Sequence, residues 1–464
     1  MANSNLGGET EGGAALRSNY LSFAESLAQT LGSMAPSGGL AVIIPLVFVN
    51  SGNGTWLLYV LTIVAYLFLA VNLNVFAAHS ASAGGLVEYP ELGLGRWAGP
   101  VAGWCYLATL VFALASAAPS AAFYGGLVLE RQFGIGTSPA IAGGLTVVFI
   151  VAAWWAAHRD VRLSTDVMLV IECLSIGAML TLALVYMIHT GRWFDRHQFR
   201  LEGVTLRGMR LGLVLALMSL TGFETVTTFG AEAKHALITI PRAIATCLAP
   251  IGLLYLVMAY ALTSAFRGNA VSLDQSNAPF DQVAAQAGWP AFSAVVSIGV
   301  TLSFFACLLG CLNAASRILY SMAIRGHACS AMGRIHSRNG TPARAVAVIA
   351  SISLSIPAAM LAWGVSLGDC IGYLSQLASI GFVGSYLLVC LAVPFYLKRV
   401  NRPSLKATIA SFFSLVILGY ALISSVYPVP PAPWDCLPYI FVGIVCAGLS
   451  STIFISRGYV GRPA

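Results

Sequence analysis

Long apolar runs alternate with short polar breaks along the whole chain. Between Glu25 and Glu88 the sequence holds no Asp, Glu, Lys or Arg, and similar charge-free windows cover 97–129, 282–316 and 407–434. A helix needs roughly 20 apolar residues to cross the hydrocarbon core of a bilayer, so each window is long enough for one or two crossings. The runs are continuous rather than alternating in about ten-residue segments, which favours helices over a membrane β-barrel.

These runs predict an all-α integral membrane protein with twelve transmembrane helices. Their approximate limits are 27–50, 55–78, 98–129, 137–157, 167–189, 209–230, 243–266, 289–322, 344–363, 371–397, 406–427 and 436–456. No stretch between them is long enough to fold alone, so residues 21–464 are expected to form a single membrane domain. Residues 1–20 are rich in Gly, Asn, Ser and Glu and lack the layout of a signal peptide. We expect them to form a disordered cytoplasmic tail.

Composition and charge agree with a membrane protein. Hydrophobic residues make up 58% of the chain and charged residues only 9%, whereas soluble proteins average about 25% charged residues. An excess of Lys and Arg marks the cytoplasmic loops of membrane proteins. With the N-terminus inside, 17 of the 24 Lys and Arg residues face the cytoplasm. This pattern predicts a protein of the cell (inner) membrane with both termini cytoplasmic, and the basic loops do not indicate a nucleic-acid partner.

The first predicted helix contains a helix-breaking segment, Gly-Ser-Met-Ala-Pro-Ser-Gly-Gly, at 32–39. Proline cannot donate a backbone hydrogen bond and clashes with the preceding turn, and glycine weakens a helix further. Non-helical backbone at membrane depth survives only where it is buried in protein or lines a wet cavity. The segment therefore predicts a broken helix that lines a site, and the alternative is a kinked helix that packs through its small residues.

The sixth predicted helix has a second weak point, at 219–224. Interrupted helices at matching places in two halves of a chain are typical of a midplane site in inverted-repeat transporters. A broken helix leaves N–H groups free at one half-helix and carbonyl groups free at the other, which suit a carboxylate and an ammonium group respectively. The predicted substrate-binding residues are Ala35, Pro36, Ser37, Gly38, Gly39, Ser219, Leu220, Thr221, Gly222 and Phe223.

A few carboxylates fall inside or beside the predicted spans, where an ionisable residue is a functional hypothesis by default. Glu224 follows the second break, and because burying its anion is costly it could carry a proton; the alternative is a structural carboxylate. For Glu172, in the fifth helix, functional and structural roles stay equally open. Glu25 and Glu232 fall at helix ends, where an interfacial place costs little. No catalytic, nucleotide-binding or metal-binding motif is present, so we expect neither an enzyme nor a cofactor.

Four motifs in order resemble the amino acid/polyamine/organocation (APC) permease superfamily. They are the first break, the loop Ser82-Ala83-Gly84-Gly85-Leu86 with Glu88-Tyr89 and Gly93-Leu94-Gly95-Arg96, then Gly222-Phe223-Glu224 with Ile240-Pro241-Arg242, and Leu312-Asn313-Ala314-Ala315-Ser316-Arg317 with Gly340-Thr341-Pro342. The resemblance implies a LeuT-type five-plus-five inverted repeat, with repeat one at about 21–190 and repeat two at about 205–397. Helices at about 406–456 lie outside the repeat.

The resemblance also implies roles for the two breaks. Backbone at 35–39 would receive a substrate carboxylate, backbone at 219–222 would contact the amino group, and Glu224 would help to couple protons or to gate. Some proton-coupled members carry a Lys in helix five that aligns with Ser175, one turn from Glu172. Because that Lys is missing, sodium use or exchange stays open, and the coupling or gating candidates are Glu224, Glu172 and Ser175.

The expected function is secondary active transport of amino acids across the cytoplasmic membrane by alternating access, proton-coupled or exchanging. One alternative is a polyamine or cationic amine carrier, because Glu172 and Glu224 would both favour a cation. Another is a non-transporting amino-acid sensor on the same scaffold, because the sequence departs from the family pattern after helices six and eight. The expected partners are an amino acid or amine, the lipid bilayer, and protons or sodium, and a homodimer stays open.

Overall fold

The computed structural model describes residues 16–267, 272–276, 279–427 and 429–460. Within these ranges the chain forms α-helices and short 3-10 turns and no β-strand. The helices are α1 (Phe23–Met34), α2 (Pro36–Ser51), α3 (Thr55–Ala77), α4 (Glu88–Leu94), α5 (Ala98–Phe133), α6 (Pro139–Arg159), α7 (Val161–Thr190), α8 (Arg196–Phe199), α9 (Leu206–Met218), α10 (Ala236–Phe266), α11 (Pro279–Gln286), α12 (Phe292–Ile324), α13 (Ala343–Ala362), α14 (Leu367–Arg399), α15 (Leu405–Ser424) and α16 (Leu437–Val460). The all-helical prediction is confirmed.

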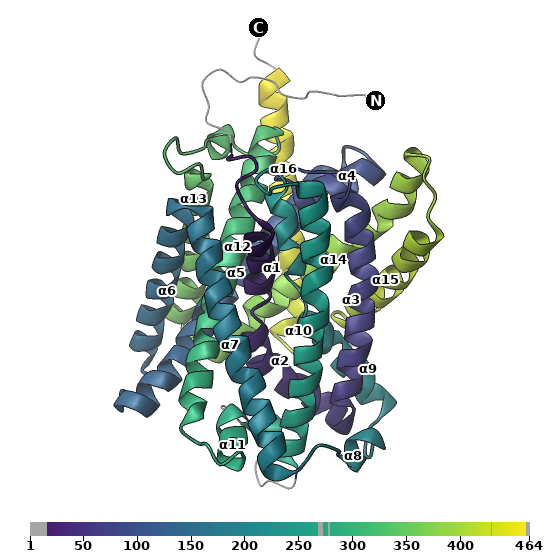
Figure 1. Cartoon of the computed structure of the whole chain (residues 1–464). Helices are drawn as coiled ribbons and strands as arrows, with labels where there is room; N and C mark the ends of the chain where they lie inside the picture. Colours follow the sequence, from purple (N-terminus) through teal and green to yellow (C-terminus); the bar gives the residue numbers. More distant parts are fainter. Residues whose placement is uncertain (1–15, 268–271, 277–278, 428, 461–464) are drawn as a thin grey trace.

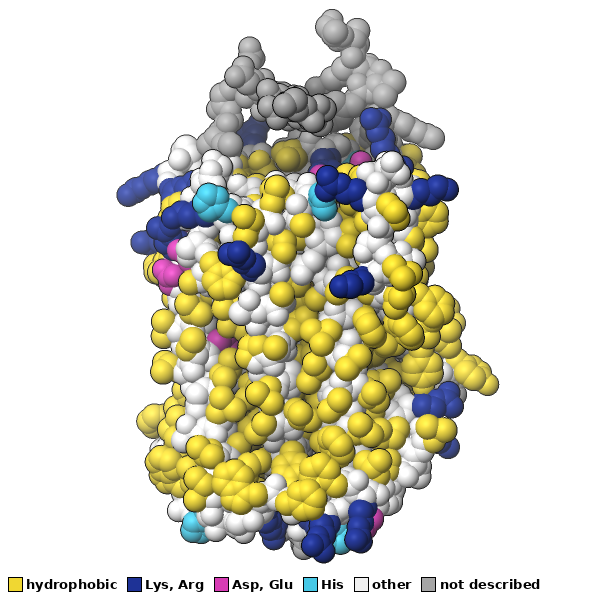
Figure 2. All heavy atoms as spheres, turned by 45° about the vertical axis from the view of Figure 1, so that its right-hand side comes forward, with side chains coloured by type: hydrophobic (Ala, Val, Ile, Leu, Met, Phe, Trp, Pro, Cys, Tyr) yellow, Lys and Arg dark blue, Asp and Glu magenta, His cyan; other side chains and the backbone are white. Residues whose placement is uncertain are grey.

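Eleven segments of the described chain are long and apolar enough to cross a membrane. The first, Phe23–Ala77, is 55 residues long and covers both of the first two predicted helices, which separate at the 3-10 turn η1 (Gly52–Gly54). The other ten segments correspond to the remaining predicted helices. On the face drawn in Figure 2, hydrophobic side chains cover the middle of the molecule, and Lys and Arg gather mostly toward its two ends, as expected for a bilayer-spanning protein.

The helices form one bundle around α5. This helix is the most buried of the candidate spans, whereas α16 is the least buried, and α5 packs most extensively against α12 and α14. In Figure 1, α1 begins and α16 ends at the upper end of the bundle, while α8 and α11 lie at the lower end. These two ends are called upper and lower below.

The interruption predicted at 32–39 is confirmed at a single residue. Helix α1 ends at Met34, Ala35 takes the left-handed conformation with φ 44°, and Pro36 begins α2. Proline is favoured at the first position of a helix, because its missing N–H would have no partner there and its φ is already helical. The chain therefore crosses the membrane as two half-helices joined by one non-helical residue.

The predicted helix at 209–230 is also divided. Helix α9 ends at Met218, turns follow, and the 3-10 helix η3 covers Phe223–Phe229. Gly222 takes φ 98°, a conformation that glycine adopts without the clash that a Cβ would cause. The second predicted interruption is therefore confirmed as well.

The predicted tail lies partly outside the described residues, which begin at position 16. Residues 16–20 are described and contact the rest of the chain: Arg17 pairs with Asp160 at 3.2 Å, and the Tyr20 hydroxyl donates to Asp160 at 3.0 Å. Burial and the hydrogen bond with Asp160 raise the pKa of Tyr20, so the phenol stays a hydrogen-bond donor at neutral pH.

Candidate functional site

The two breaks contact each other in the middle of the bundle. A Cβ placed on Gly222 would lie 2.7 Å from the Ser33 carbonyl oxygen, which means that the two backbones touch. Thr225 Oγ1 also lies within hydrogen-bond distance of Ser33 Oγ, at 2.9 Å, and of the Gly222 carbonyl oxygen, at 2.8 Å. Two helix ends from separate parts of the sequence therefore meet at one place.

The break between α1 and α2 presents free backbone groups. The Gly39 N–H donates to the Ala35 carbonyl at 2.8 Å and so begins the hydrogen-bond ladder of α2. The amides of Ser37 and Gly38 precede that ladder, where helix geometry leaves N–H groups without a partner inside the helix. The partial positive charge of a helix N-terminus adds to these donors, so the start of α2 suits an anionic group.

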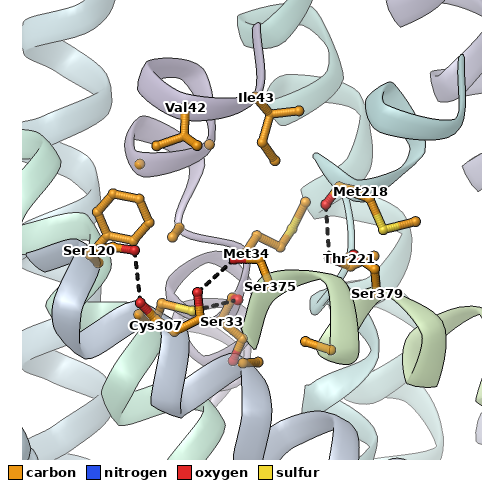
Figure 3. Close-up of a pocket in the computed structure, with 18 of the residues that line it drawn as sticks. Ser33, Met34, Val42, Ile43, Ser120, Met218, Thr221, Cys307, Ser375 and Ser379 are labelled. Atoms are coloured by element: carbon orange, nitrogen blue, oxygen red, sulfur yellow. Dashed lines mark hydrogen bonds between the residues drawn. The ribbon is translucent and has the colours of Figure 1, made fainter. Parts of the chain in front are cut away.

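A cavity of about 150 Å³ lies against both breaks. Its walls come from α1, α2, α5, α9, α12 and α14 and consist of Ser33, Met34, Ala35, Gly38, Gly39, Val42, Ile43, Ala113, Ser116, Ala117, Ser120, Met218, Thr221, Phe304, Cys307, Ile371, Ser375, Ala378, Ser379 and Phe382. Figure 3 shows Val42 and Ile43 on one side, Ser33 and Cys307 on the opposite side, and Met218 and Thr221 at one flank.

The chemistry of these walls is apolar with a few hydroxyl groups. Six lining residues carry a hydroxyl, namely Ser33, Ser116, Ser120, Thr221, Ser375 and Ser379. The others are aliphatic, aromatic, sulfur-containing or glycine, and no acidic, basic or His residue lines the cavity among the described residues. A solute with a charged side chain would find no counter-ion on these walls. A neutral apolar side chain needs none and fits such walls.

Four of the ten predicted substrate-binding residues line this cavity: Ala35, Gly38, Gly39 and Thr221. The other six lie behind its walls and are Pro36, Ser37, Ser219, Leu220, Gly222 and Phe223. Ser219 Oγ lies 3.2 Å from the Tyr59 hydroxyl, and Phe223 packs edge-on against Tyr66. The Ser37 hydroxyl is buried without a partner among the described residues. These six positions hold the shape of the breaks.

Glu224 is fully buried just behind the cavity. Its two oxygens accept hydrogen bonds from the Tyr106 hydroxyl at 2.9 Å and the Tyr386 hydroxyl at 2.5 Å. The Gly222 N–H donates to it at 3.1 Å. The carboxyl group thereby links η3 to α5 and α14, the two helices that carry much of the cavity wall.

Glu172 and Ser175 lie elsewhere, between α7 and α12. Glu172 is fully buried and accepts from Ser303 Oγ at 2.9 and 3.2 Å. The Ser175 hydroxyl has no hydrogen-bond partner among the described residues and faces Gly299, whose Cβ would meet it at 2.9 Å. Neither residue lines the cavity. In the described chain, no group of three His, Cys, Asp or Glu side chains is placed to hold a metal ion.

A buried ion pair closes the upper side of the site. Arg317 on α12 forms two hydrogen bonds to the carboxylate of Glu232, and both side chains are 1% exposed. The Glu232 carbonyl accepts from the N–H groups of Tyr20 and Leu21, at 2.7 and 3.0 Å. The expectation that Glu232 is interfacial is therefore wrong, because Arg317 compensates its charge inside the protein.

Glu25 is also buried, at 7% exposure, and pairs with Arg162 at 2.6 Å. Its predicted interfacial place is wrong for the same physical reason. Below these pairs, α2 and α9 are the lower half-helices at the two breaks, and both line the cavity. The lining residues of α14 lie in the first half of that helix. The Glu232–Arg317 and Glu25–Arg162 pairs therefore lie on the upper side of the cavity.

Sequence reasoning missed the walls that α5, α12 and α14 supply. On α5 the missed positions are small residues at helical spacing, Ala113, Ser116, Ala117 and Ser120, and on α14 they include Ile371, Ser375 and Ser379, each four residues apart. Stripes of small residues are also typical of plain helix packing in membranes. The signal was present, but it does not by itself separate a cavity wall from a packing surface.

Comparison with known proteins identifies a membrane permease. The model of the amino acid permease family matches residues 25–429, so the chain belongs to this family, and the resemblance to the APC superfamily is confirmed. Together with its apolar helices, this makes the chain a multi-pass membrane protein.

Three relatives illustrate the range of similarity. The chain is 27% identical over 225 residues to the branched-chain amino acid permease BcaP of Lactococcus lactis, an alignment that covers 47% of this chain and 45% of that protein. It is 22% identical over 419 residues to BcaP of Bacillus subtilis, covering 86% and 85% of the two chains. It is 25% identical over 311 residues to the aromatic amino acid transport protein AroP of Corynebacterium glutamicum, covering 64% of each.

Proposed function

We propose that this chain transports neutral amino acids with apolar side chains across the cytoplasmic membrane by alternating access. The observation that carries the proposal is the cavity between the two breaks, which has free backbone donors at one wall and, among the described residues, no charged side chain on any wall. Relatives named for branched-chain and aromatic amino acids support the same substrate class.

In this proposal the backbone binds the constant part of the substrate. The amide of Gly38, on the cavity wall, receives the carboxylate, and carbonyl groups at the ends of α1 and α9 receive the ammonium group. The side chain lies among Ala117, Phe304 and Phe382. A volume of about 150 Å³ suits one amino acid with a medium-sized side chain.

We also propose that the chain has twelve membrane spans. Ten of them form a five-plus-five inverted repeat, at about 21–190 and 205–397, and α15 and α16 lie outside it. Helices α1–α2 and α9–η3 then hold matching places in the two repeats, and both are broken. The excess of basic residues in the loops on one side supports a cytoplasmic location of both termini. The cavity, sealed on the upper side by the Glu232–Arg317 pair, would then face outward.

Two alternatives from the sequence have less support. A polyamine carrier needs acidic groups around its ligand, whereas Glu172 and Glu224 both lie behind the walls. A non-transporting sensor could use the same cavity and differs only in the absence of flux. Coupling to protons, to sodium or to a counter-substrate is a separate proposal from the substrate class. Assembly into a homodimer is another.

Flux measurements on purified protein in liposomes test the proposal. We expect saturable uptake of labelled leucine, isoleucine or phenylalanine, and little competition from lysine, glutamate or putrescine. Ala117→Phe should abolish uptake because the added ring fills the cavity. Val148→Phe, at a 59% exposed position of α6, is the matched control and should transport normally. Binding without flux would select the sensor, and putrescine uptake would select the amine carrier.

A further inference from the structure

A second and larger cavity lies on the lipid-facing side of the bundle, between α5, α13 and α16. It has a volume of about 530 Å³, within the range of small-molecule binding pockets. Among the described residues that line it, Ser451 alone carries a hydroxyl group, and the others are apolar or cysteine. We call this cavity the α5–α13–α16 groove. Its walls offer nothing to a polar solute.

The groove is fixed by specific contacts. Helices α13 and α16 each pack on α5, which makes α5 the floor and the other two helices the walls. The Trp104 indole N–H donates to Thr452 Oγ1 at 2.8 Å, and Thr452 donates to the His327 carbonyl at 2.8 Å. A Cβ on Gly448 would meet the Trp104 ring at 2.4 Å. Helix α16 is therefore held tightly on α5 beside the groove.

The groove runs along the membrane normal from a point near the upper end. Its α13 wall includes Val348, Ile352 and Ile356, which follow each other at a spacing of four residues on one helix face. At 1.5 Å per residue this stripe is about 12 Å long. A second membrane-crossing helix would need roughly 30 Å of contact surface. The groove is too short to be the docking site of such a helix.

Basic residues lie at the upper rim. Arg344 is one turn before Val348 on the same face of α13, and Arg334 follows the groove-lining Met332 by two residues. Both arginines are exposed, and neither forms an ion pair within the described part of the chain. The rim therefore carries two exposed arginines that lie within one turn or two residues of groove-lining positions.

We infer that the α5–α13–α16 groove binds an anionic phospholipid, with one acyl chain along α5 and the phosphate against Arg344 and Arg334. The guanidinium group binds phosphate oxygens with paired, charge-assisted hydrogen bonds. The apolar channel below it accommodates the acyl chain. The charged rim and the apolar channel follow each other in the same order as the head group and the tail of a phospholipid. The bound lipid would fill the gap between α13 and α16 and brace both against α5.

Lipid retention by the full-length protein tests this inference. Protein purified in mild detergent is mixed with equal amounts of phosphatidylglycerol and phosphatidylcholine that have the same acyl chains, and the retained lipid is counted by native mass spectrometry. We expect a preference of about tenfold for phosphatidylglycerol, which corresponds to about 1.4 kcal/mol. Arg344→Gln should remove most of this preference, and Ile352→Trp should remove retention because the indole fills the channel.

Two variants are matched controls. Ile409→Trp, on α15, changes an isoleucine that is 44% exposed, as Ile352 is. Arg402→Gln removes an exposed arginine at the turn between α14 and α15. Both controls should keep lipid retention and the preference for the anionic head group. Equal retention of the two lipids by the unchanged protein, or equal effects of Ile352→Trp and Ile409→Trp, would overturn the inference.

Site-resolved alkylation is a second measurement that needs no variant. Cys329 is exposed and lines the groove, whereas Cys173 is exposed on α7, away from it. Phosphatidylglycerol should slow the alkylation of Cys329 at least about threefold and leave Cys173 unchanged. Phosphatidylcholine or glycerol phosphate should protect neither. If Cys329 reacts equally fast with and without phosphatidylglycerol, the inferred site is wrong.

Discussion

Glu224 accepts three hydrogen bonds although it is fully buried. Tyr106, Tyr386 and the Gly222 amide surround its two oxygens. Among the described residues, Glu172 accepts a side-chain hydrogen bond only from the Ser303 hydroxyl. Of the two buried carboxyl groups, Glu224 is therefore tied more closely to the cavity, because its partners lie on the helices that form the wall.

We predict that Glu224→Gln lowers substrate uptake about tenfold or more. The amide has only one acceptor oxygen, and losing one hydrogen bond to a charged group costs about 1.5–3 kcal/mol. If Glu224 carries the coupled proton, the variant should also flatten the pH dependence of uptake in liposomes, because an amide does not titrate. Tyr106→Phe keeps the carboxyl group and should lower the rate while the pH profile persists. An unchanged pH profile in Glu224→Gln, with a flattened one in Glu172→Gln, would assign the proton to Glu172.

The sequence predicted a single residue only where that residue is unusual at its own position in the chain. A carboxylate inside an apolar run is visible by itself, and so Glu224 and Glu172 were found. The Glu232–Arg317 pair was missed because its partners are 85 positions apart, and each alone resembles an interfacial residue. The hydroxyl groups of the cavity wall were missed because serine and alanine also serve as packing residues in membrane helices.

The broken helices depend on backbone that most residues cannot adopt. Ala35 and Gly222 both have positive φ values, and the surrounding carbonyl groups are placed by this local geometry. The backbone at breaks of this kind is strained, so neighbouring contacts must offset its cost. At Gly222 the contact is with the Ser33 backbone, so any added atom would push the two half-helices apart.

We predict that Gly222→Ala lowers the melting temperature and abolishes transport. A side chain in the left-handed conformation costs about 1–2 kcal/mol, and the new Cβ would also clash with the Ser33 carbonyl. The control is Gly143→Ala on α6, where nothing lies within 4 Å of the added Cβ; alanine favours a helix there and should leave transport unchanged. The measurements are thermal unfolding in detergent and leucine uptake. Normal uptake by Gly222→Ala would remove the need for close contact between the breaks.

Both breaks could be predicted at the level of the element because Pro and Gly act locally on the backbone. The positions 32–39 and 219–224 needed no knowledge of the fold. The contact between the two breaks depends on how distant segments pack. No single motif in the sequence predicts it. The matching places of the two breaks in the two halves of the chain supplied the expectation of a shared site, whereas composition alone did not.

The whole molecule is asymmetric between its two ends. At the upper end, the segment before α1 pairs with the loop after η3 through Leu21 and Ala233, and Glu232–Arg317 lies beneath. The cavity lies on the other side of this closure. In the proposed alternating-access cycle the closure opens once in each turnover, so its strength would set the balance between the two states.

We predict that Glu232→Gln destabilises the closed upper end. Removing one partner leaves Arg317 buried and unpaired, which costs about 3–5 kcal/mol. In a variant whose only cysteine is the cavity-lining Cys307, a soluble maleimide added from the upper side should react several-fold faster after the change. Asp281→Asn, which breaks the exposed pair with Arg131, should leave the labelling rate unchanged, because exposed pairs contribute about 0–1 kcal/mol. Unchanged labelling in both variants would mean that other contacts hold the upper end closed.

The charge-free wall of the cavity has a consequence for cells that carry this protein. An apolar pocket discriminates poorly between a substrate and an isostere that differs by one small group. If the cavity takes apolar amino acids as proposed, toxic mimics of these amino acids are admitted along with the nutrient. Under selection by such an antimetabolite, resistant mutants should carry changes at Ala113, Ala117 or Phe304, where a bulkier or smaller residue alters the fit of the side chain while the backbone groups that hold its zwitterion stay in place.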